Sequence, residues 1–154
     1  MAAESGLELR LEVNGLGVQA MLINRSGALR SVLNNSDLEP SRLMLTSSAG
    51  KQVAPFDERT RRKFDTSVSL AMYSDIAAGG SLKLEQARFV KAPHGYELSW
   101  GPFRFSEISA GAWKARVEFE SNIDWITTGG KRVPAGKPVW KGKLLSNEVE
   151  LHLP

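Results

Sequence analysis

Residues 108–119 read ISAGAWKARVEF, and this stretch decides the fold class of the chain. A short turn that contains Gly111 leads into a run from Trp113 to Phe119 in which apolar and polar residues alternate. A similar phrase occurs at residues 76–85, IAAGGSLKLE, where a glycine turn again precedes an alternating run. Glycine turns between short alternating runs are typical of antiparallel β-sheets. The two copies therefore predict an antiparallel β-sandwich.

The same pattern extends through the rest of the chain. Residues 7–13, LELRLEV, alternate strictly and predict a half-buried first strand. Further strands are expected at residues 18–23, 29–33, 42–46, 82–89, 96–100 and 113–121, and residues 143–153 are expected to form one final strand. Residues 68–72 are expected to form a strand or an extended segment. About eight or nine strands without a helix predict an all-β, immunoglobulin-like antiparallel β-sandwich with two long loops.

The aromatic residues divide into two groups. Phe103, Phe105, Trp113 and Phe119 fall in or beside predicted strands at alternating positions, so we expect them in the core. Trp100 and Trp125 instead lie next to turns, where an exposed indole could stack on a sugar ring or anchor a protein partner.

Length and composition narrow the function classes. With 154 residues, the chain is expected to form a single domain over residues 1–154, large enough to bury a core without disulfides or metals. There is no cysteine, which excludes thiolate zinc sites and thiol chemistry. His94 and His152 are the two histidines, too few for a three-histidine zinc site, and we expect both on the surface. No serine-nucleophile motif is present, so we expect no cofactor and no enzyme activity.

Charge and hydropathy bear on partners and location. The net charge of +3 comes from 20 basic and 17 acidic residues, an excess too small to indicate nucleic acid. No apolar run reaches the length of a membrane span. The start, MAAESG, is short and polar for a signal peptide, which leaves a cytoplasmic protein or an exported one whose leader was replaced. The small residues before the first strand favour a periplasmic or secreted protein.

The first expected loop covers residues 54–65, APFDERTRRKFD. It carries Arg59, Arg61 and Arg62, whose guanidinium groups offer forked donors to anionic oxygens. The functional interpretation is a binding surface for phosphate or for an acidic partner. The alternative is a solvated loop, balanced by its own carboxylates. Because no aromatic residues that could stack on bases are interleaved with the arginines, an acidic protein surface is the better candidate.

The second expected loop covers residues 122–138, which are rich in glycine, proline and lysine. Asp124, Trp125, Lys131 and Arg132 are its candidate binding residues. Loops at the end of a sandwich are the usual place for recognition, and an exposed indole can anchor a partner.

Two segments of the second half resemble a known family. Residues 108–117 resemble the L-x-P-G-x-Y-x-x-x-V entry to the penultimate strand of bacterial immunoglobulin-like domains. Residues 139–149, VWKGKLLSNEV, resemble the W-x-G-x-L-x-S-N-x-V strand that ends them. Such domains are similar to the BsuPI family of intracellular proteinase inhibitors and to modules attached to secreted peptidases. In this resemblance Trp113 stands where a tyrosine corner usually has its tyrosine, and an indole N–H could replace the hydroxyl donor.

Two functions are open as hypotheses. The first is a non-catalytic protein-binding module, with a peptidase or another secreted enzyme as the partner that the resemblance implies. The second is a carbohydrate-binding or cell-envelope module that uses Trp100, Trp125 and Trp140 as stacking platforms.

Overall fold

The regular structure of this protein consists almost entirely of strands. The computed structural model describes residues 6–63 and 65–154. In that part of the chain the helical elements are two short 3-10 helices, η1 (Glu58–Arg61) and η2 (Leu70–Met72). The paired strands run antiparallel. The prediction of an all-β, sandwich-like fold is therefore confirmed.

The first sheet holds the N-terminal hairpin. Its order is β1 (Leu7–Asn14), β2 (Gly17–Asn24) and β7 (Ser81–Arg88). The expected alternation of the first strand is present, because Leu7, Leu9 and Leu11 are buried while their charged neighbours face outward.

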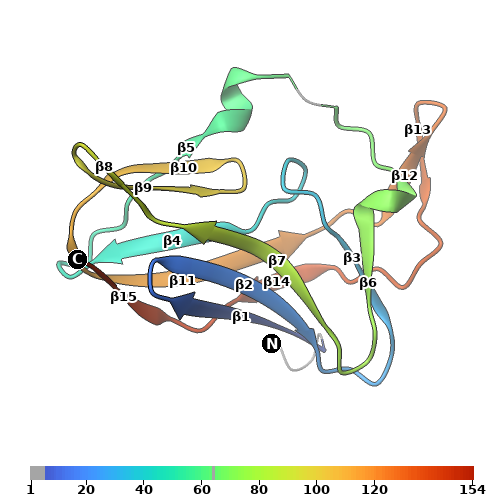
Figure 1. The fold of residues 1–154 in the computed structure, drawn as a ribbon. Helices are drawn as coiled ribbons and strands as arrows, with labels where there is room; N and C mark the ends of the chain where they lie inside the picture. The colour runs from blue at the N-terminus through green and yellow to red at the C-terminus, as the bar shows by residue number, and fades with distance from the viewer. Residues whose placement is uncertain (1–5, 64) are drawn as a thin grey trace.

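The second sheet is built on β11 (Gly111–Ser121), the longest of the strands. β4 (Arg42–Ser47) pairs with one side of β11. On the other side, β14 (Gly142–Leu145) and β15 (Val149–Leu153) follow one another along its length. In Figure 1 the β1-β2-β7 sheet lies across this second sheet, and residues of β1 pack against β11, β14 and β15.

A third sheet and two hairpins complete the fold. The third sheet has the order β5 (Phe56–Asp57), β10 (Phe103–Ile108), β9 (Gly95–Trp100) and β8 (Val90–Ala92). One two-stranded sheet pairs β3 (Arg30–Leu33) with β6 (Tyr73–Ile76). The other pairs β12 (Trp125–Thr128) with β13 (Lys131–Pro134).

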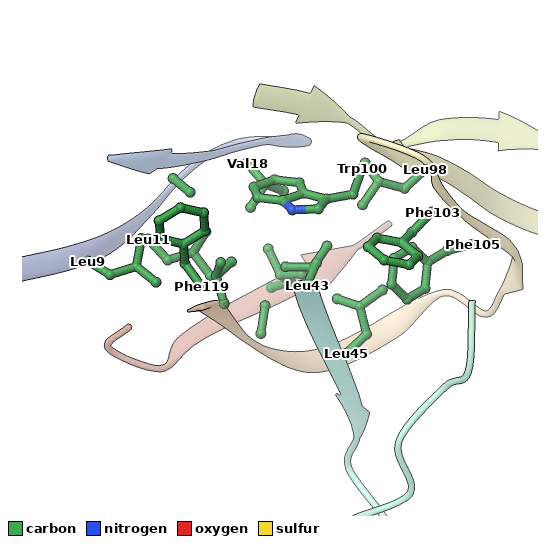
Figure 2. Close-up of a cluster of buried hydrophobic side chains, with 14 of the residues drawn as sticks. Leu9, Leu11, Val18, Leu43, Leu45, Leu98, Trp100, Phe103, Phe105 and Phe119 are labelled. Atoms are coloured by element: carbon green, nitrogen blue, oxygen red, sulfur yellow. The ribbon is translucent and has the colours of Figure 1, made fainter. Parts of the chain in front are cut away.

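The core lies between the sheets. Figure 2 shows Leu9 and Leu11 of the first sheet facing Phe119 of the second, while Trp100 and Phe105 of the third sheet extend the same cluster. The four aromatic residues expected in the core are buried: Phe103, Phe105, Trp113 and Phe119.

Trp100 and Trp140 are also buried. The expectation that these two indoles are exposed for stacking on a sugar ring is therefore wrong. Trp100 has no exposed surface, and its indole Nε1 donates a hydrogen bond to Ser41 Oγ at 3.0 Å. Trp140 is 5% exposed and stacks on Phe119, with 6.1 Å between the ring centroids. Both rings lie next to turns in the sequence. They are nevertheless buried between the sheets, where large apolar side chains fill the core.

The prediction of one final strand over residues 143–153 is wrong. The strand is interrupted between β14 and β15, and the apolar side chain of Leu145 is 50% exposed. Asn147 lies in the interruption. Its side chain accepts a hydrogen bond from Leu11 N at 2.8 Å and donates one to Leu11 O at 3.1 Å, thereby joining the two sheets.

Two further expectations need correction. In residues 68–72 the backbone at Ser69 is extended, and the 3-10 helix η2 follows before β6 begins at Tyr73. Residues 122–138, expected as a loop, contain the β12–β13 hairpin. Gly129 and Gly130 supply its two turn residues, with φ of +55° and +76°, the left-handed conformation that a two-residue hairpin turn requires.

Candidate functional site

The β12–β13 hairpin projects from the body of the protein (Figure 1, upper right). All four residues of β13 are exposed, and Lys131 and Arg132 lie directly after the turn. β12 is held close to the turn by residue 68. Thr127 N donates to Val68 O at 2.7 Å, and Val68 N donates to Thr127 Oγ1 at 3.0 Å. Two hydrogen bonds with Thr127 therefore attach the backbone at Val68 to β12.

Trp125 is held between a small second core and Arg132. Its ring packs on a cluster built around Leu33, Val68 and Tyr73. The Tyr73 hydroxyl donates a hydrogen bond to Trp125 O at 2.6 Å. The Arg132 guanidinium lies 4.2 Å from the centroid of the indole, within the range of a cation–π contact.

The Tyr73 hydroxyl beneath this site stays protonated. Burial, with smaller contributions from the nearby carboxylates of Asp124 and Glu39, raises the pKa of Tyr73 to about 12. The phenol therefore keeps its proton, and the hydrogen bond that it donates to Trp125 O, throughout the physiological pH range.

A groove of about 410 Å³ opens beside this indole. The Trp125 groove, as we call it, is lined by residues that three separate segments contribute: Leu38, Thr66, Ser67, Val68, Ile123, Trp125, Thr127, Gly130 and Arg132. Its lining mixes apolar side chains with three hydroxyl groups, and Arg132 adds a guanidinium. An extended segment with an apolar side chain next to a carboxylate would match this arrangement.

Asp124 is engaged within the protein. Lys141 Nζ lies 2.8 Å from Asp124 Oδ2, and Asp124 O accepts a hydrogen bond from Ala135 N at 3.1 Å. Asp124 therefore closes the base of the hairpin and does not line the groove.

The three arginines of the first loop have different surroundings. Arg59 is the least exposed, and its guanidinium binds both carboxylate oxygens of Asp57 and donates to Asp37 O at 3.0 Å. Arg62 forms an ion pair with Asp37 at 2.6 Å. Arg61 lies over the Phe56 ring, 4.4 Å from its centroid, and is exposed without a carboxylate partner in the described part of the chain. Arg61 is thus the member of the trio best placed to meet an external anion.

The two carboxylates that contact these arginines have lowered pKa values. Hydrogen bonding to Arg62 holds the pKa of Asp37 below its usual range. Hydrogen bonding to Arg59 does the same to the pKa of Asp57. Both carboxylates are therefore fully charged at neutral pH, and they neutralise the two arginines that they contact.

The turn at residues 35–39 connects the two candidate loops, a role that sequence reasoning missed. On one side Asp37 binds Arg59 and Arg62 of the first loop. On the other side the Glu39 carboxylate accepts hydrogen bonds from Asn122 N at 2.8 Å and Ile123 N at 3.1 Å, where the second loop begins. Two acidic residues beside an Asn-rich turn were the available signal, because carboxylates in turns often bind free backbone N–H groups.

The two histidines, His94 and His152, are exposed, as expected. Among the described residues, no three metal-binding side chains form a group, and no helix is long and apolar enough to cross a membrane. Comparisons with protein-family models, curated proteins and solved structures found no match.

Proposed function

We propose that this chain is a non-catalytic protein-binding module that recognises its partner through the Trp125 groove. The observation that carries the proposal is the indole itself. Trp125 is half-buried on a fixed base and covered by Arg132. Aromatic and arginine side chains are the residues that most often dominate binding energy at protein interfaces. A ring already ordered before binding also loses little conformational entropy when a partner arrives.

The charges around the groove favour an acidic partner segment. Lys131 and Arg132 have no carboxylate partner in the described residues, and neither does Arg61 on the adjoining loop. The turn at residues 35–39 contacts both segments, through Asp37 on the side of Arg62 and through Glu39 on the side of Asn122. A peptidase or another secreted enzyme is the partner class that the sequence resemblance suggests, and it belongs to this proposal on that basis.

The proposal can be tested by capture with matched variants. The purified chain is immobilised and exposed to extract from the source organism, and the retained proteins are identified by mass spectrometry. The Arg132→Gln and Trp125→Phe variants alter the groove while leaving the hairpin in place. Lys91→Gln removes an equivalent exposed charge from β8, on a different sheet. We expect at least one protein that Lys91→Gln retains and both groove variants lose. Identical retention by all the variants would contradict the proposal.

Inhibition assays test the narrower part of the proposal. Purified peptidases are assayed with increasing amounts of wild-type protein and of Trp125→Phe. Inhibition that weakens at least tenfold in the variant would support a peptidase partner. If a captured partner has no hydrolase activity, the peptidase assignment is wrong while the binding function still holds.

A further inference from the structure

The outer edge of β13 is free. β13 pairs with β12 along one edge, and among the described residues no strand pairs with the other. All four residues of β13 are exposed, and the hairpin projects from the body of the protein (Figure 1, upper right). A free strand edge presents backbone donors and acceptors to which another extended chain can pair.

The pairing within the hairpin shows which backbone groups of β13 face outward. In an antiparallel pair of strands, hydrogen-bonded residue pairs alternate with pairs whose N–H and C=O groups point away from each other. Thr127 N donates outside the hairpin, to Val68 O at 2.7 Å. Because Thr127 lies opposite Arg132, the N–H and C=O groups of Arg132 also point away from the partner strand.

Two further contacts agree with this alternation. Trp125 O, two residues before Thr127 on β12, accepts its hydrogen bond from outside the hairpin, from the Tyr73 hydroxyl at 2.6 Å. Residue 124 then bonds across the hairpin again, because its carbonyl accepts from the backbone N–H of residue 135 at 3.1 Å. The outward N–H and C=O of Arg132 have no hydrogen-bond partner within the described part of the protein.

The charges of the hairpin make this edge basic. Residues 124–137 contain one acidic residue, Asp124, against Lys131, Arg132 and Lys137. Asp124 and Lys137 are held in ion pairs with residues outside this segment. Lys131 and Arg132, which lie on the free edge, have no carboxylate partner in the described residues. An extended segment that pairs with this edge is therefore favoured if it carries carboxylates.

We propose that an acidic, extended segment of the partner protein adds to β13 as a further antiparallel strand, pairing with the backbone of Arg132. Proteins that bind peptides in this way gain affinity from the backbone hydrogen bonds and specificity from alternate side chains. In antiparallel pairing, one peptide residue can bond to both outward groups of Arg132. This inference rests on the proposed function, since it describes how the partner of the Trp125 groove is held.

The side chains of β13 define the sequence that the added strand should carry. The peptide residue opposite Arg132 lies on the face of the hairpin that carries Trp125, because Arg132 contacts that ring. The peptide residues on either side of it lie beside Lys131 and Val133, on the opposite face. Carboxylates opposite the two basic residues and an apolar side chain opposite the exposed Val133 would match this edge.

A second copy of this chain is a poorer occupant of the edge. Two copies paired through their β13 backbones would place the two Arg132 side chains directly opposite each other, and like charges in that position are destabilising. Pro134 has no N–H group, so it cannot donate to an added strand. Edge residues of these kinds limit pairing between identical strands, which leaves a segment of opposite charge as the better match.

NMR titration with designed peptides tests strand addition. The probe is the blocked pentapeptide Thr-Val-Glu-Glu-Thr. One control peptide carries N-methyl groups on both glutamates, which removes their backbone donors and keeps their charges. A second control replaces both glutamates with glutamine. Arg132→Gln removes the guanidinium and keeps the outward N–H, whereas Arg132→Pro removes both. Proline is tolerated at an edge position whose N–H faces away from the ladder.

We expect the probe to produce saturable shifts of the Arg132 amide and to slow its hydrogen exchange. Both control peptides should bind at least tenfold more weakly than the probe. Arg132→Pro should bind the probe at least fivefold more weakly than Arg132→Gln does. Lys91→Gln on β8, the charge-matched control, should stay within twofold of the wild type. Thermal unfolding verifies that each variant is folded, and the N-methylated peptide tests the inference on the wild-type protein alone.

Three results would overturn strand addition. They are the absence of a saturable shift at Arg132, equal affinity for the probe and its N-methylated form, and a shift of the Arg132 amide with protein concentration alone, which would indicate a second copy. If the N-methylated peptide binds equally well and shifts the Trp125 indole N–H, strand addition is wrong while the groove remains a binding surface. The proposed function itself fails only through the captured partner and the groove variants.

Discussion

The indole Nε1 of Trp113 donates a hydrogen bond to the carbonyl oxygen of Ser109 at 2.8 Å. Ser109 lies four residues before Trp113, so this bond closes the turn that leads into β11. It supplies the donor that the sequence resemblance expects from a tyrosine at this position. The ring itself is 7% exposed, so one side chain both fills the core and holds the turn that precedes it.

Replacing this tryptophan with phenylalanine should destabilise the protein. Trp113→Phe keeps an aromatic ring in the core but leaves Ser109 O without its donor. The loss of one hydrogen bond and the smaller ring together should lower the free energy of unfolding by about 1–3 kcal/mol. Urea unfolding followed by circular dichroism measures the difference. Ser109→Ala keeps the carbonyl and should stay within about 0.5 kcal/mol of the wild type. Equal losses in the two variants would argue against the hydrogen bond.

Asn147 offers a second test of how the sheets are joined. Asn147→Ala removes both hydrogen bonds to the Leu11 backbone on the edge of β1. We expect a loss of about 1–2 kcal/mol, because two backbone groups lose partners at a partly exposed site. Hydrogen exchange of the Leu11 amide should accelerate in step with the loss. Asn122→Ala, an exposed position, provides the control. An unchanged Leu11 exchange rate would show that Asn147 does not hold this edge.

The sequence predicted secondary structure best where a residue pattern is compatible with a single kind of element. The alternation of residues 7–13 and 113–119 could be satisfied only by strands with one buried face, and β1 and β11 are such strands. The break at Ser146–Glu148 could not be predicted, because it depends on Asn147 reaching a strand 136 residues away. The burial of Trp100 and Trp140 likewise depends on which sheets meet, and neighbouring residues in the sequence do not encode that directly.

Glu39 should control the order of the second candidate loop. Its carboxylate accepts from Asn122 N, Ile123 N and the Ser121 hydroxyl. Glu39→Ala leaves these donors without an acceptor, so we expect a loss of about 2 kcal/mol, in the range for hydrogen bonds to charged groups. Glu39→Gln should lose less. Amide exchange at Asn122 and Ile123 is the measurement, and protection that survives in Glu39→Ala would contradict this role.

Acid should weaken the first loop. The pKa of Asp37 is lowered in the folded protein by its hydrogen bond to Arg62, so its contribution to stability is complete above the unfolded pKa of 3.8 and is lost as the pH falls through the lower folded pKa. Arg62→Gln should raise the pKa of Asp37 toward its ordinary value and make stability less steeply dependent on pH below about 4. NMR titration of the Asp37 carboxyl carbon measures the shift. An unchanged titration curve would exclude the ion pair as its cause.

Glu85 should show the opposite dependence. Burial raises the pKa of the Glu85 carboxyl, so its contribution to stability is largest below the unfolded pKa and is lost as the pH rises through the folded value. Glu85→Gln removes the charge, and the variant should gain stability relative to the wild type at pH 7 but not at pH 4. Thermal midpoints at the two pH values test this. An equal difference at both would contradict it.

For the candidate site, the sequence named two segments but did not distinguish how their residues are engaged within the protein. Trp125 and Arg132 meet at 4.2 Å because the hairpin turn at Gly129–Gly130 brings their strands side by side. Within the arginine trio, Arg59 and Arg62 are engaged by Asp37 and Asp57 while Arg61 is not. Charge alone could not separate them, because the carboxylates that decide the matter come partly from a turn more than 20 residues earlier.

The central claim is that the Trp125 groove is the surface through which this protein binds a partner. Calorimetric titration of the captured partner against wild type, Arg132→Gln and Lys91→Gln tests it most directly, with unfolding midpoints measured on the same samples. We predict that Arg132→Gln raises the dissociation constant at least tenfold without changing the unfolding midpoint. Lys91→Gln should bind with the affinity of the wild type. Equal affinity of all three proteins would contradict the claim.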